Sequence, residues 1–290
     1  MRIGVFGNRC KEDQLHVISG LFDRLKVLQA DVFIQPLLAD FLREKFGYTP
    51  AMKGELNESG MDLDMALSVG GDGTFLRTVL QIHKHHIPIL GINTGRLGFL
   101  ADIGSDQIDE TLDELFRGDY QIEERSLLQL VTENRTVEDF NYALNEIAVS
   151  KRDTASMITI HAYLNGDYLT SYRGSGLLVA TPTGSTAYSM SVNGPILLPQ
   201  NRCFILSPVA PHSLNVRSIV IPDDYTITLK IESRTNTFLV ALDGRSQEMP
   251  DGMMLTIKMA DFKTRLIKRF NHSFYRTLRE KLMWGADGRS

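Results

Sequence analysis

The sequence is poor in the features that mark secreted scaffolds and membrane proteins. It holds two cysteines, Cys10 and Cys203, which lie far apart and lack metal-ligand spacing. A disulfide framework is therefore not expected, and the chain is predicted to be intracellular. No apolar run approaches the roughly 18 residues of a membrane helix, and residues 1–14 resemble a short strand followed by charge, not a signal peptide. We expect a cytoplasmic protein without a membrane partner.

Neither sign of charge is in large excess. There are 31 Lys and Arg residues against 35 Asp and Glu residues, so the formal net charge is -4 and the isoelectric point is near 6.0. This balance argues against nucleic-acid binding by charge alone, and no nucleic-acid partner is expected. The chain of 290 residues is 43% hydrophobic, which is enough for one large domain or two medium ones.

The first part of the chain alternates short apolar runs with helical spacing. In the helical stretches, apolar residues recur every three or four positions, as Leu15, Ile18, Leu21, Leu25 and Leu28 do. Alternation of this kind predicts a mostly parallel sheet with helices on its faces. The expected strands are residues 2–7, 31–35, 64–71 and 87–93, and the expected helices are residues 15–28, a segment after Pro36, and residues 75–86.

A period of two replaces this pattern after about residue 120. Apolar and polar residues alternate over residues 157–164, 226–232 and 254–260, with turns such as NGD between such runs, which indicates an antiparallel β domain. Residues 263–269, KTRLIKR, are predicted to be a strand with a solvated basic face, and residues 274–284 regain helical spacing. We expect an α/β domain over residues 1–122, completed by residues 271–290, and a β-rich, sandwich-like domain over residues 123–270.

The first glycine-rich segment, GGDGT (residues 70–74), follows a strand and opens a helix. In an open α/β sheet ligands bind beyond the carboxyl ends of the strands, where glycines let backbone amides approach phosphate oxygens. Asp72 would repel a phosphate, so its carboxylate suits a sugar hydroxyl or a magnesium ion. The alternative is a tight turn in which Asp72 caps the helix.

Two further glycine-rich segments stand in similar positions. GINTGRLGFL (residues 91–100) overlaps the end of the next strand and could line the same crevice, or it could be an irregular connection. TPTGSTAYS (residues 181–189) follows a strand with small and hydroxyl-bearing residues. It could form a polar wall beside a flat ligand, or it could be a loop that caps a short helix.

Taken together, these segments resemble the NAD kinase family. GGDGT, GINTGRLGFL, LNE (residues 144–146), TPTGSTAYS, SPVAPH (residues 207–212) and DGRSQE (residues 243–248) stand in the order of that family. The resemblance implies transfer of the terminal phosphoryl group of ATP to the 2'-hydroxyl of the adenosine ribose of NAD. It also implies a divalent cation, expected to be Mg²⁺ and without dedicated protein ligands, and a homodimer or homotetramer formed through the β-rich domain.

The resemblance also assigns roles to individual residues. Asp72 matches the aspartate that meets the ribose hydroxyl, and it is the candidate catalytic base. Phe99 is expected against the adenine, and Asn145 and Glu146 match the pair that holds NAD. The other residues expected to contact NAD are Gly73, Ser175, Thr181, Ala187, Tyr188, Ser189 and Asp243, and those expected to hold the ATP phosphates are Gly70, Gly71, Gly73 and Thr74.

One position departs from the family. The run RGSGLL carries Ser175 where an aspartate is usual, and that aspartate is associated with the nicotinamide end of NAD. Two alternatives therefore stay open. One is a lipid or sphingoid-base kinase, because such kinases also carry GGDGT. The other is an NAD(H)-binding sensor that has lost turnover, although the presence of Asp72 speaks against a sensor.

Overall fold

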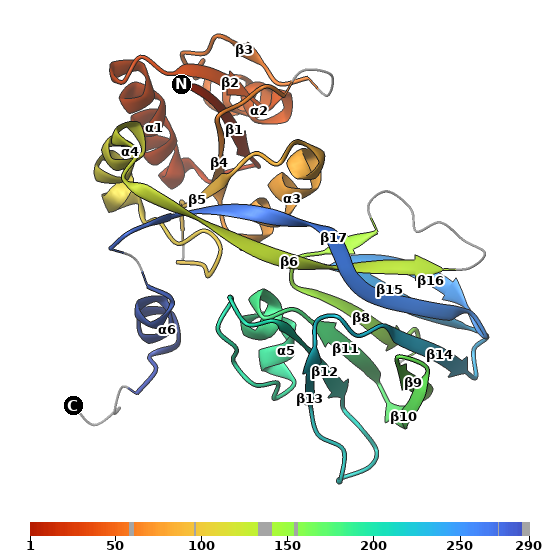
Figure 1. Ribbon diagram of the computed structural model, residues 1–290. Coiled ribbons are helices and arrows are strands. Elements are labelled where there is room, and N and C mark those ends of the chain that lie inside the picture. Colours follow the sequence, from red (N-terminus) through yellow and green to blue (C-terminus); the bar gives the residue numbers. More distant parts are fainter. Residues whose placement is uncertain (58–60, 96, 133–140, 154–155, 272, 286–290) are drawn as a thin grey trace. The chain divides into compact units, whose positions relative to one another are not determined.

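The computed structural model describes residues 1–57, 61–95, 97–132, 141–153, 156–271 and 273–285, and these form two compact units (Figure 1). The first unit joins Met1–Glu124 to Thr264–Ser290, and the second is Arg125–Lys263. Each unit has its own buried apolar core. Two strands, β6 (Tyr120–Thr132) and β17 (Met254–Arg269), carry the chain between the units.

The first unit is built on a parallel sheet in the order β3-β2-β1-β4-β5. Strands β1 and β4 are buried along almost their whole length, as expected for parallel strands covered on both faces. The last residues of β17 extend this sheet beside β5, where Leu266 pairs with Ile89. The strands are β1 (Arg2–Gly7), β2 (Asp31–Ile34), β3 (Gly54–Glu55), β4 (Met65–Gly70) and β5 (Ile89–Asn93).

Five α-helices accompany this sheet in the described residues, and α1 packs against α4 (Figure 1). Helix α2 begins with Pro36, whose missing N–H is harmless in a first turn. The sequence prediction missed α4, although Ile108, Leu112 and Leu115 mark its buried side. The helices are α1 (Leu15–Val27), α2 (Pro36–Phe46), α3 (Asp72–Ile82), α4 (Ile108–Arg117) and α6 (Phe274–Leu282), with 3-10 turns η1 (Glu12–Gln14), η2 (His83–His85) and η3 (Ser105–Gln107).

The second unit is a sandwich of two antiparallel sheets. One sheet has the order β10-β9-β14-β17, with β6 beside β17 and β7 beside β6, and the other has the order β13-β12-β11-β8-β15-β16. Side chains of both sheets share one core, to which Ile160, Leu229, Val179 and Phe204 belong. The remaining strands are β7 (Tyr142–Ala143), β8 (Glu146–Lys151), β9 (Ile158–Leu164), β10 (Asp167–Gly174), β11 (Gly176–Ala180), β12 (Cys203–Val209), β13 (Ile219–Pro222), β14 (Ile227–Ser233), β15 (Thr237–Leu242) and β16 (Arg245–Pro250). The parallel α/β unit, the antiparallel unit and the C-terminal helix confirm the predicted fold class.

The basic run at the end of β17 is only partly solvated, contrary to the sequence prediction. Lys263 and Arg265 are exposed, whereas Lys268 and Arg269 are each 7% exposed. Lys268 pairs with Asp102, and Arg269 pairs with Glu110 and Glu114 of α4. The strand enters the first unit here, so its last two cations need carboxylate partners.

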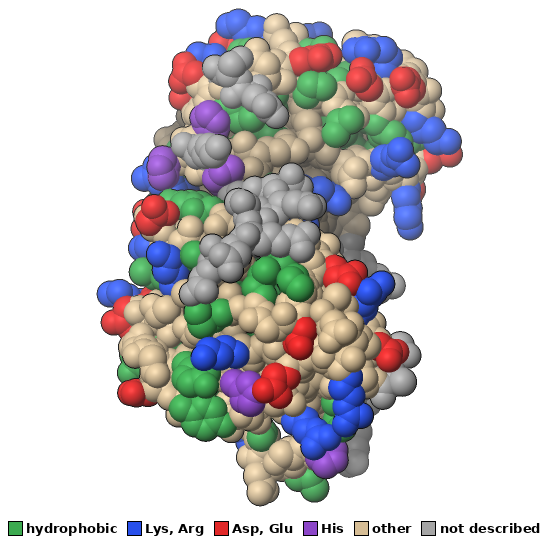
Figure 2. All heavy atoms as spheres, turned by 90° about the vertical axis from the view of Figure 1, so that its right-hand side faces the viewer, with side chains coloured by type: hydrophobic (Ala, Val, Ile, Leu, Met, Phe, Trp, Pro, Cys, Tyr) green, Lys and Arg blue, Asp and Glu red, His purple; other side chains and the backbone are tan. Residues whose placement is uncertain are grey.

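On the face shown in Figure 2, basic and acidic side chains are interspersed among the described residues. No helix in the described part of the chain is long and apolar enough to cross a bilayer.

Candidate active site

The GGDGT turn joins β4 to α3 and requires its first glycine. Gly70 has φ +151°, and a Cβ atom there would lie 2.4 Å from Thr74 Oγ1. Gly71 is the N-cap of α3, and Asp72 is the first helical residue. The helix therefore begins three residues before the predicted start and directs its positive end at this turn. Thr78 Oγ1 donates a hydrogen bond to Ser68 Oγ (3.1 Å), which helps to fix α3 on β4.

The Asp72 carboxylate binds the loop after β5 instead of capping its own helix. Oδ2 accepts a hydrogen bond from Phe99 N–H (3.0 Å), and Oδ1 accepts from Leu100 N–H (3.0 Å) and Ala101 N–H (2.9 Å). Gly98 makes this approach possible, because a Cβ atom there would lie 1.9 Å from Asp72 Oδ1. GGDGT and GINTGRLGFL therefore meet, although no helix follows the second segment until Ile108, and Arg96 lies outside the described residues.

Helix α6 contacts this carboxylate and the adjacent aromatic ring. Lys281 Nζ lies 3.6 Å from Asp72 Oδ2 and 4.5 Å from the centroid of the Phe99 ring. The rings of Phe99 and Phe274 are 6.1 Å apart at 43°. The side chains of Lys281 and Asp72 are 31% and 30% exposed, so the pair can be reached by a ligand.

A cavity of about 530 Å³ opens at the carboxyl ends of β1 and β2, beside the start of α3. The chain leaves β1 towards β2 and β3 and later returns to the other side of β1 as β4, so this is the topological switch point of the sheet. The lining includes Asn8, Arg9, Gln35, Thr74 and Arg77. Sequence reasoning missed both arginines, although Arg9 is the second residue after a strand and Arg77 stands one helical turn after Thr74.

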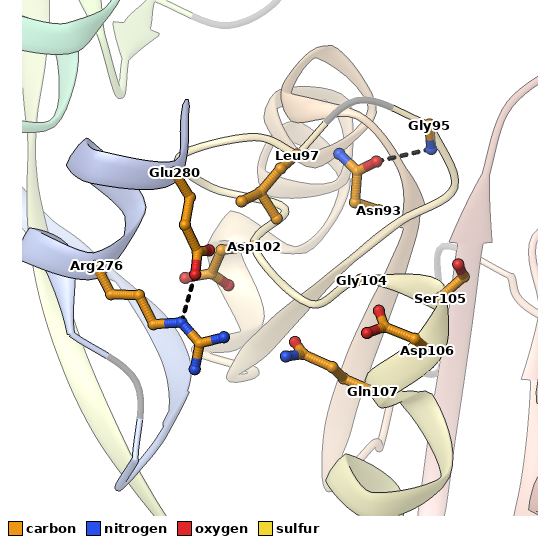
Figure 3. Close-up of a pocket in the computed structure, with 10 residues that line it drawn as sticks. All are labelled: Asn93, Gly95, Leu97, Asp102, Gly104, Ser105, Asp106, Gln107, Arg276 and Glu280. Carbon is orange, nitrogen blue, oxygen red and sulfur yellow. Dashed lines mark hydrogen bonds and ion pairs between the residues drawn. The ribbon is translucent and has the colours of Figure 1, made fainter. Parts of the chain in front are cut away.

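A smaller cavity of about 300 Å³ lies between α6 and the loop after β5 (Figure 3). On its α6 side, Arg276 and Glu280 form an ion pair of 2.7 Å. Asp106 and Gln107 belong to the opposite side, near the start of α4 (Figure 3). Helix α6 thus forms one wall of this cavity. The other wall is the loop after β5, part of which is bound by the Asp72 carboxylate.

In the second unit, Asp243 organises the LNE segment. It stands in the turn between β15 and β16 with φ +47°. Its carboxylate accepts hydrogen bonds from the backbone N–H groups of Leu144 (2.7 Å), Asn145 (2.8 Å) and Glu146 (3.1 Å). Burial raises the pKa of Asp243, and these three donors oppose that rise.

Glu146 begins β8, which is a central strand between β11 and β15. Asn145 and Glu146 are each 9% exposed, so they do not form an exposed strand edge. Glu146 Oε2 is buried without a hydrogen-bond partner in the described structure. Burial and the neighbouring Asp243 carboxylate raise the pKa of Glu146 to about 8, against a hydrogen bond from the Tyr188 backbone. A buried, unpartnered carboxylate oxygen is suited to a ligand hydroxyl.

TPTGSTAYS folds into the 3-10 turn η4 (Thr183–Thr186) and the short helix α5 (Tyr188–Ser191). Thr181 is fully buried, and its Oγ1 donates to Leu144 C=O (2.6 Å). Ser189 is also fully buried, and its Oγ lies 3.4 Å from Ser207 Oγ. These two hydroxyls hold the turn, whereas Tyr188 is 46% exposed. Ala187 and Tyr188 are therefore more accessible to solvent than the hydroxyls of Thr181 and Ser189.

Ser175 lies between β10 and β11 with a half-buried side chain. Its N–H donates to Val209 C=O (3.0 Å), and its C=O accepts from Lys151 N–H (3.0 Å). The backbone at the position that departs from the family is thus held on both sides.

Comparison with known proteins identifies the family of the chain. The family model of the ATP-NAD kinase N-terminal domain matches residues 25–120, and the model of the C-terminal domain matches residues 144–269. An NAD kinase of Bacteroides fragilis is 47% identical over 289 residues, which is 100% of both chains. An NAD kinase of Porphyromonas gingivalis is 45% identical over 285 residues, which is 98% of both chains.

Solved structures give the same result for the fold. A yeast NADH kinase in complex with NADH has a TM-score of 0.88 at 21% identity, and the match covers 99% of this chain and 89% of that one. An NAD kinase from Archaeoglobus fulgidus in complex with ATP has a TM-score of 0.77 at 28% identity, covering 98% of this chain and 99% of that one. Both domain matches and the full-length relatives show that the chain belongs to the NAD kinase family.

Proposed function

We propose that Asp72 and Glu146 are the two carboxylates with which this chain performs the NAD kinase reaction. In that reaction the terminal phosphoryl group of ATP is transferred to the 2'-hydroxyl of the adenosine ribose of NAD, and NADP and ADP are formed. Asp72 orients the attacking hydroxyl and accepts its proton, and Glu146 binds a ribose hydroxyl of NAD. Asp243 supports Glu146 by holding the backbone of residues 144–146.

The role of Asp72 is supported by the hydrogen bonds that its carboxylate already accepts. A carboxylate offers about four acceptor sites, and three of them take the backbone N–H groups of Phe99, Leu100 and Ala101. The remaining site is on Oδ2, the oxygen nearer to Lys281. A carboxylate that is fixed in three directions and open in the fourth is suited to orienting one hydroxyl, which is what phosphoryl transfer requires.

The binding of ATP is assigned to the cavity at the topological switch point. The first N–H groups of α3 have no partners within the helix and favour an anion there. Arg9 and Arg77 add two cations to a lining that also holds Asp40 and Glu44. Gly70, Gly71, Gly73 and Thr74, to which the family resemblance assigns phosphate binding, then surround the terminal phosphates. We assign Mg²⁺ to the ATP phosphates, because this ion keeps several waters and favours substrate phosphates over all-protein cages; when bound, it neutralises phosphate charge.

The proposal that Glu146 binds NAD rests mainly on one observation: Glu146 Oε2 is buried and has no hydrogen-bond partner in the described structure. A ribose hydroxyl would supply the missing donor. The other residues proposed to contact NAD are Gly73, Phe99, Asn145, Ser175, Thr181, Ala187, Tyr188 and Ser189. Because Thr181 and Ser189 are fully buried, we expect them to act by shaping the turn.

The expected homodimer or homotetramer is also a proposal. Near and on β13, an end strand of its sheet in the second unit, Leu214, Ile219 and Val220 are 85%, 37% and 45% exposed. Apolar side chains at a sheet edge favour contact with another copy. Light scattering of the purified protein tests this, and a monomer at all concentrations would refute it.

The decisive experiment is NADP formation from NAD, ATP and Mg²⁺ by the pure protein and by Asp72→Asn. The wild type should form NADP. When diacylglycerol is offered as an alternative acceptor, it should remain unphosphorylated, which would exclude the lipid-kinase alternative. Asp72→Asn should lower kcat about a hundredfold or more, the usual scale for a general base, because an amide is a poor proton acceptor. NAD affinity, measured by calorimetry, should change much less.

The matched control is Asp23→Asn, which changes an exposed aspartate on α1, outside both cavities, and should leave kcat unchanged. Wild-type turnover by Asp72→Asn would remove Asp72 from the chemistry. NAD binding without any turnover by the wild type would instead favour the sensor alternative.

A further inference from the structure

Lys281 is a cation beside the proposed reaction centre that none of the sequence motifs contains. It lies near the end of α6, about 200 residues after GGDGT along the chain. Its Nζ atom is 3.6 Å from Asp72 Oδ2, the oxygen that keeps an open acceptor site. It belongs to the same compact unit as Asp72 and Phe99, so these distances are internal to one unit.

One aromatic ring contacts the ammonium, and a second ring packs against the first. It lies 4.5 Å from the centroid of the Phe99 ring, within cation–π range. Phe274, two turns earlier on α6, packs against the same ring. Because Asp72 Oδ2 also accepts the Phe99 N–H, the carboxylate, the ring and the ammonium are linked in one local arrangement.

Lys281 is not needed to compensate a buried carboxylate. Asp72 already accepts three backbone hydrogen bonds and is 30% exposed. At 3.6 Å the ammonium is slightly beyond hydrogen-bond distance, so its three N–H donors are available to another acceptor nearby. The ammonium therefore adds positive charge at the positive end of α3, beside a carboxylate that three backbone donors already hold in place.

We propose that Lys281 is a catalytic residue that binds the transferred phosphoryl group. This inference rests on the proposed function of Asp72. In the step, the 2'-oxygen forms a bond to the terminal phosphorus, and the bond between that phosphorus and the bridging oxygen breaks with its electrons leaving on ADP. The hydroxyl proton goes to Asp72 Oδ2. Lys281 keeps its protons and neutralises charge on the transferred oxygens, the main task of a protein in this chemistry.

The test compares Lys281→Met, Lys281→Arg and the control Arg279→Met. Methionine keeps an apolar stem for the Phe99 ring and removes only the charge. Arg279 is an exposed cation on the same helix, turned away from Lys281. Lys281→Met should lower kcat about a hundredfold, with the KM for NAD unchanged. Lys281→Arg should recover much of kcat, and Arg279→Met should match the wild type.

Binding measurements separate charge recognition from a structural role. Lys281→Met should bind a non-hydrolysable ATP analogue more weakly than the wild type does, whereas ADP, which lacks the terminal phosphate, should bind equally well. Equal losses for both nucleotides, a wild-type kcat, or failure of arginine to rescue would overturn the proposal. If the wild type forms NADP and Lys281→Met does so at full rate, only this inference fails; if the wild type forms none, the proposed function fails.

Discussion

At the residue scale, the two proposed carboxylates have opposite surroundings. Asp72 is satisfied by three backbone donors and a nearby cation. Glu146 is buried beside Asp243 with one oxygen unpartnered, and its pKa is raised to about 8. Asp72 therefore has its backbone partners before substrate arrives, whereas Glu146 gains its full set of partners only with a ligand.

The raised pKa of Glu146 predicts how stability and NAD binding depend on pH. Because the folded protein holds this proton more tightly than the unfolded chain, the folded state loses stability as pH rises from about 4.5 to about 8. Glu146→Gln has no such proton, so it should gain stability relative to the wild type over this range. Thermal unfolding at pH 5 and pH 8.5 measures the difference.

NAD binding should change in the opposite direction. A ribose hydroxyl donates best to the ionised carboxylate, so wild-type affinity for NAD should rise relative to Glu146→Gln as pH passes about 8. Above that pH the variant should bind NAD about one to two decades more weakly, as expected for the loss of a charge-assisted hydrogen bond of roughly 1.5–3 kcal/mol. The exposed control Glu248→Gln should show neither effect, and pH-independent affinity ratios would exclude Glu146 from the site.

Gly98 is the other residue at which a single substitution should change the activity. In Gly98→Ala the new Cβ would lie 1.9 Å from Asp72 Oδ1 and 3.0 Å from Ala101 C=O. The carboxylate must move and lose backbone donors, so kcat should fall about tenfold to a hundredfold. Gly95→Ala, in the same loop, meets only the flexible end of Gln14 at 3.4 Å and should keep full activity. Equal activities of the two variants would contradict the close packing around Asp72.

At the scale of elements, the end of β17 is attached to α4 by ion pairs. Arg269 binds Glu114 and Glu110, and Glu114 is 13% exposed in its side chain. The hydrogen bond from Arg269 lowers the pKa of Glu114. A carboxylate with a lowered pKa contributes stability above its unfolded pKa and loses it as pH falls through the folded value.

Arg269→Met should therefore destabilise the protein at neutral pH by about 3–5 kcal/mol, the usual cost of breaking a buried pair. The difference from wild type should shrink as pH falls below about 4.5, because a protonated Glu114 no longer needs a cation. Urea unfolding at pH 7 and pH 4 measures this. The exposed Arg265→Met on the same strand should change stability by less than about 0.5 kcal/mol. Equal destabilisation at both pH values would argue against the ion-pair account.

At the scale of the whole molecule, the first unit is discontinuous. It includes the returning segment that begins at Thr264, whose Ile267 lies in its core and whose Leu266 pairs with β5. A chain ended at Lys263 should therefore lose the slow hydrogen exchange of β1, β4 and β5. A chain ended at Trp284, which retains β17 and α6, should preserve it. Slow exchange of the first unit in the shorter chain would show that the returning segment is dispensable.

The sequence by itself determined the types of the main elements and the chemistry of the motifs. Spacing of three to four residues predicted α1, and a period of two predicted β9 and β14. These patterns suffice because one apolar face repeats with the period of the backbone. The order of GGDGT, LNE and TPTGSTAYS indicated the family, since those segments combine turn glycines with groups that bind phosphates and hydroxyls.

Only the tertiary structure decided which groups face one another. Asp72 meets the amides of residues 99–101, Asp243 meets those of residues 144–146, and Lys281 meets Asp72 and Phe99. Burial likewise changed Arg269 from an expected surface cation into a buried partner of α4. Each of these contacts joins residues at least 27 positions apart, and local periodicity carries no information about which distant residues meet. They arise when the sheets and helices pack, because packing determines which polar groups lose water and must find partners within the chain.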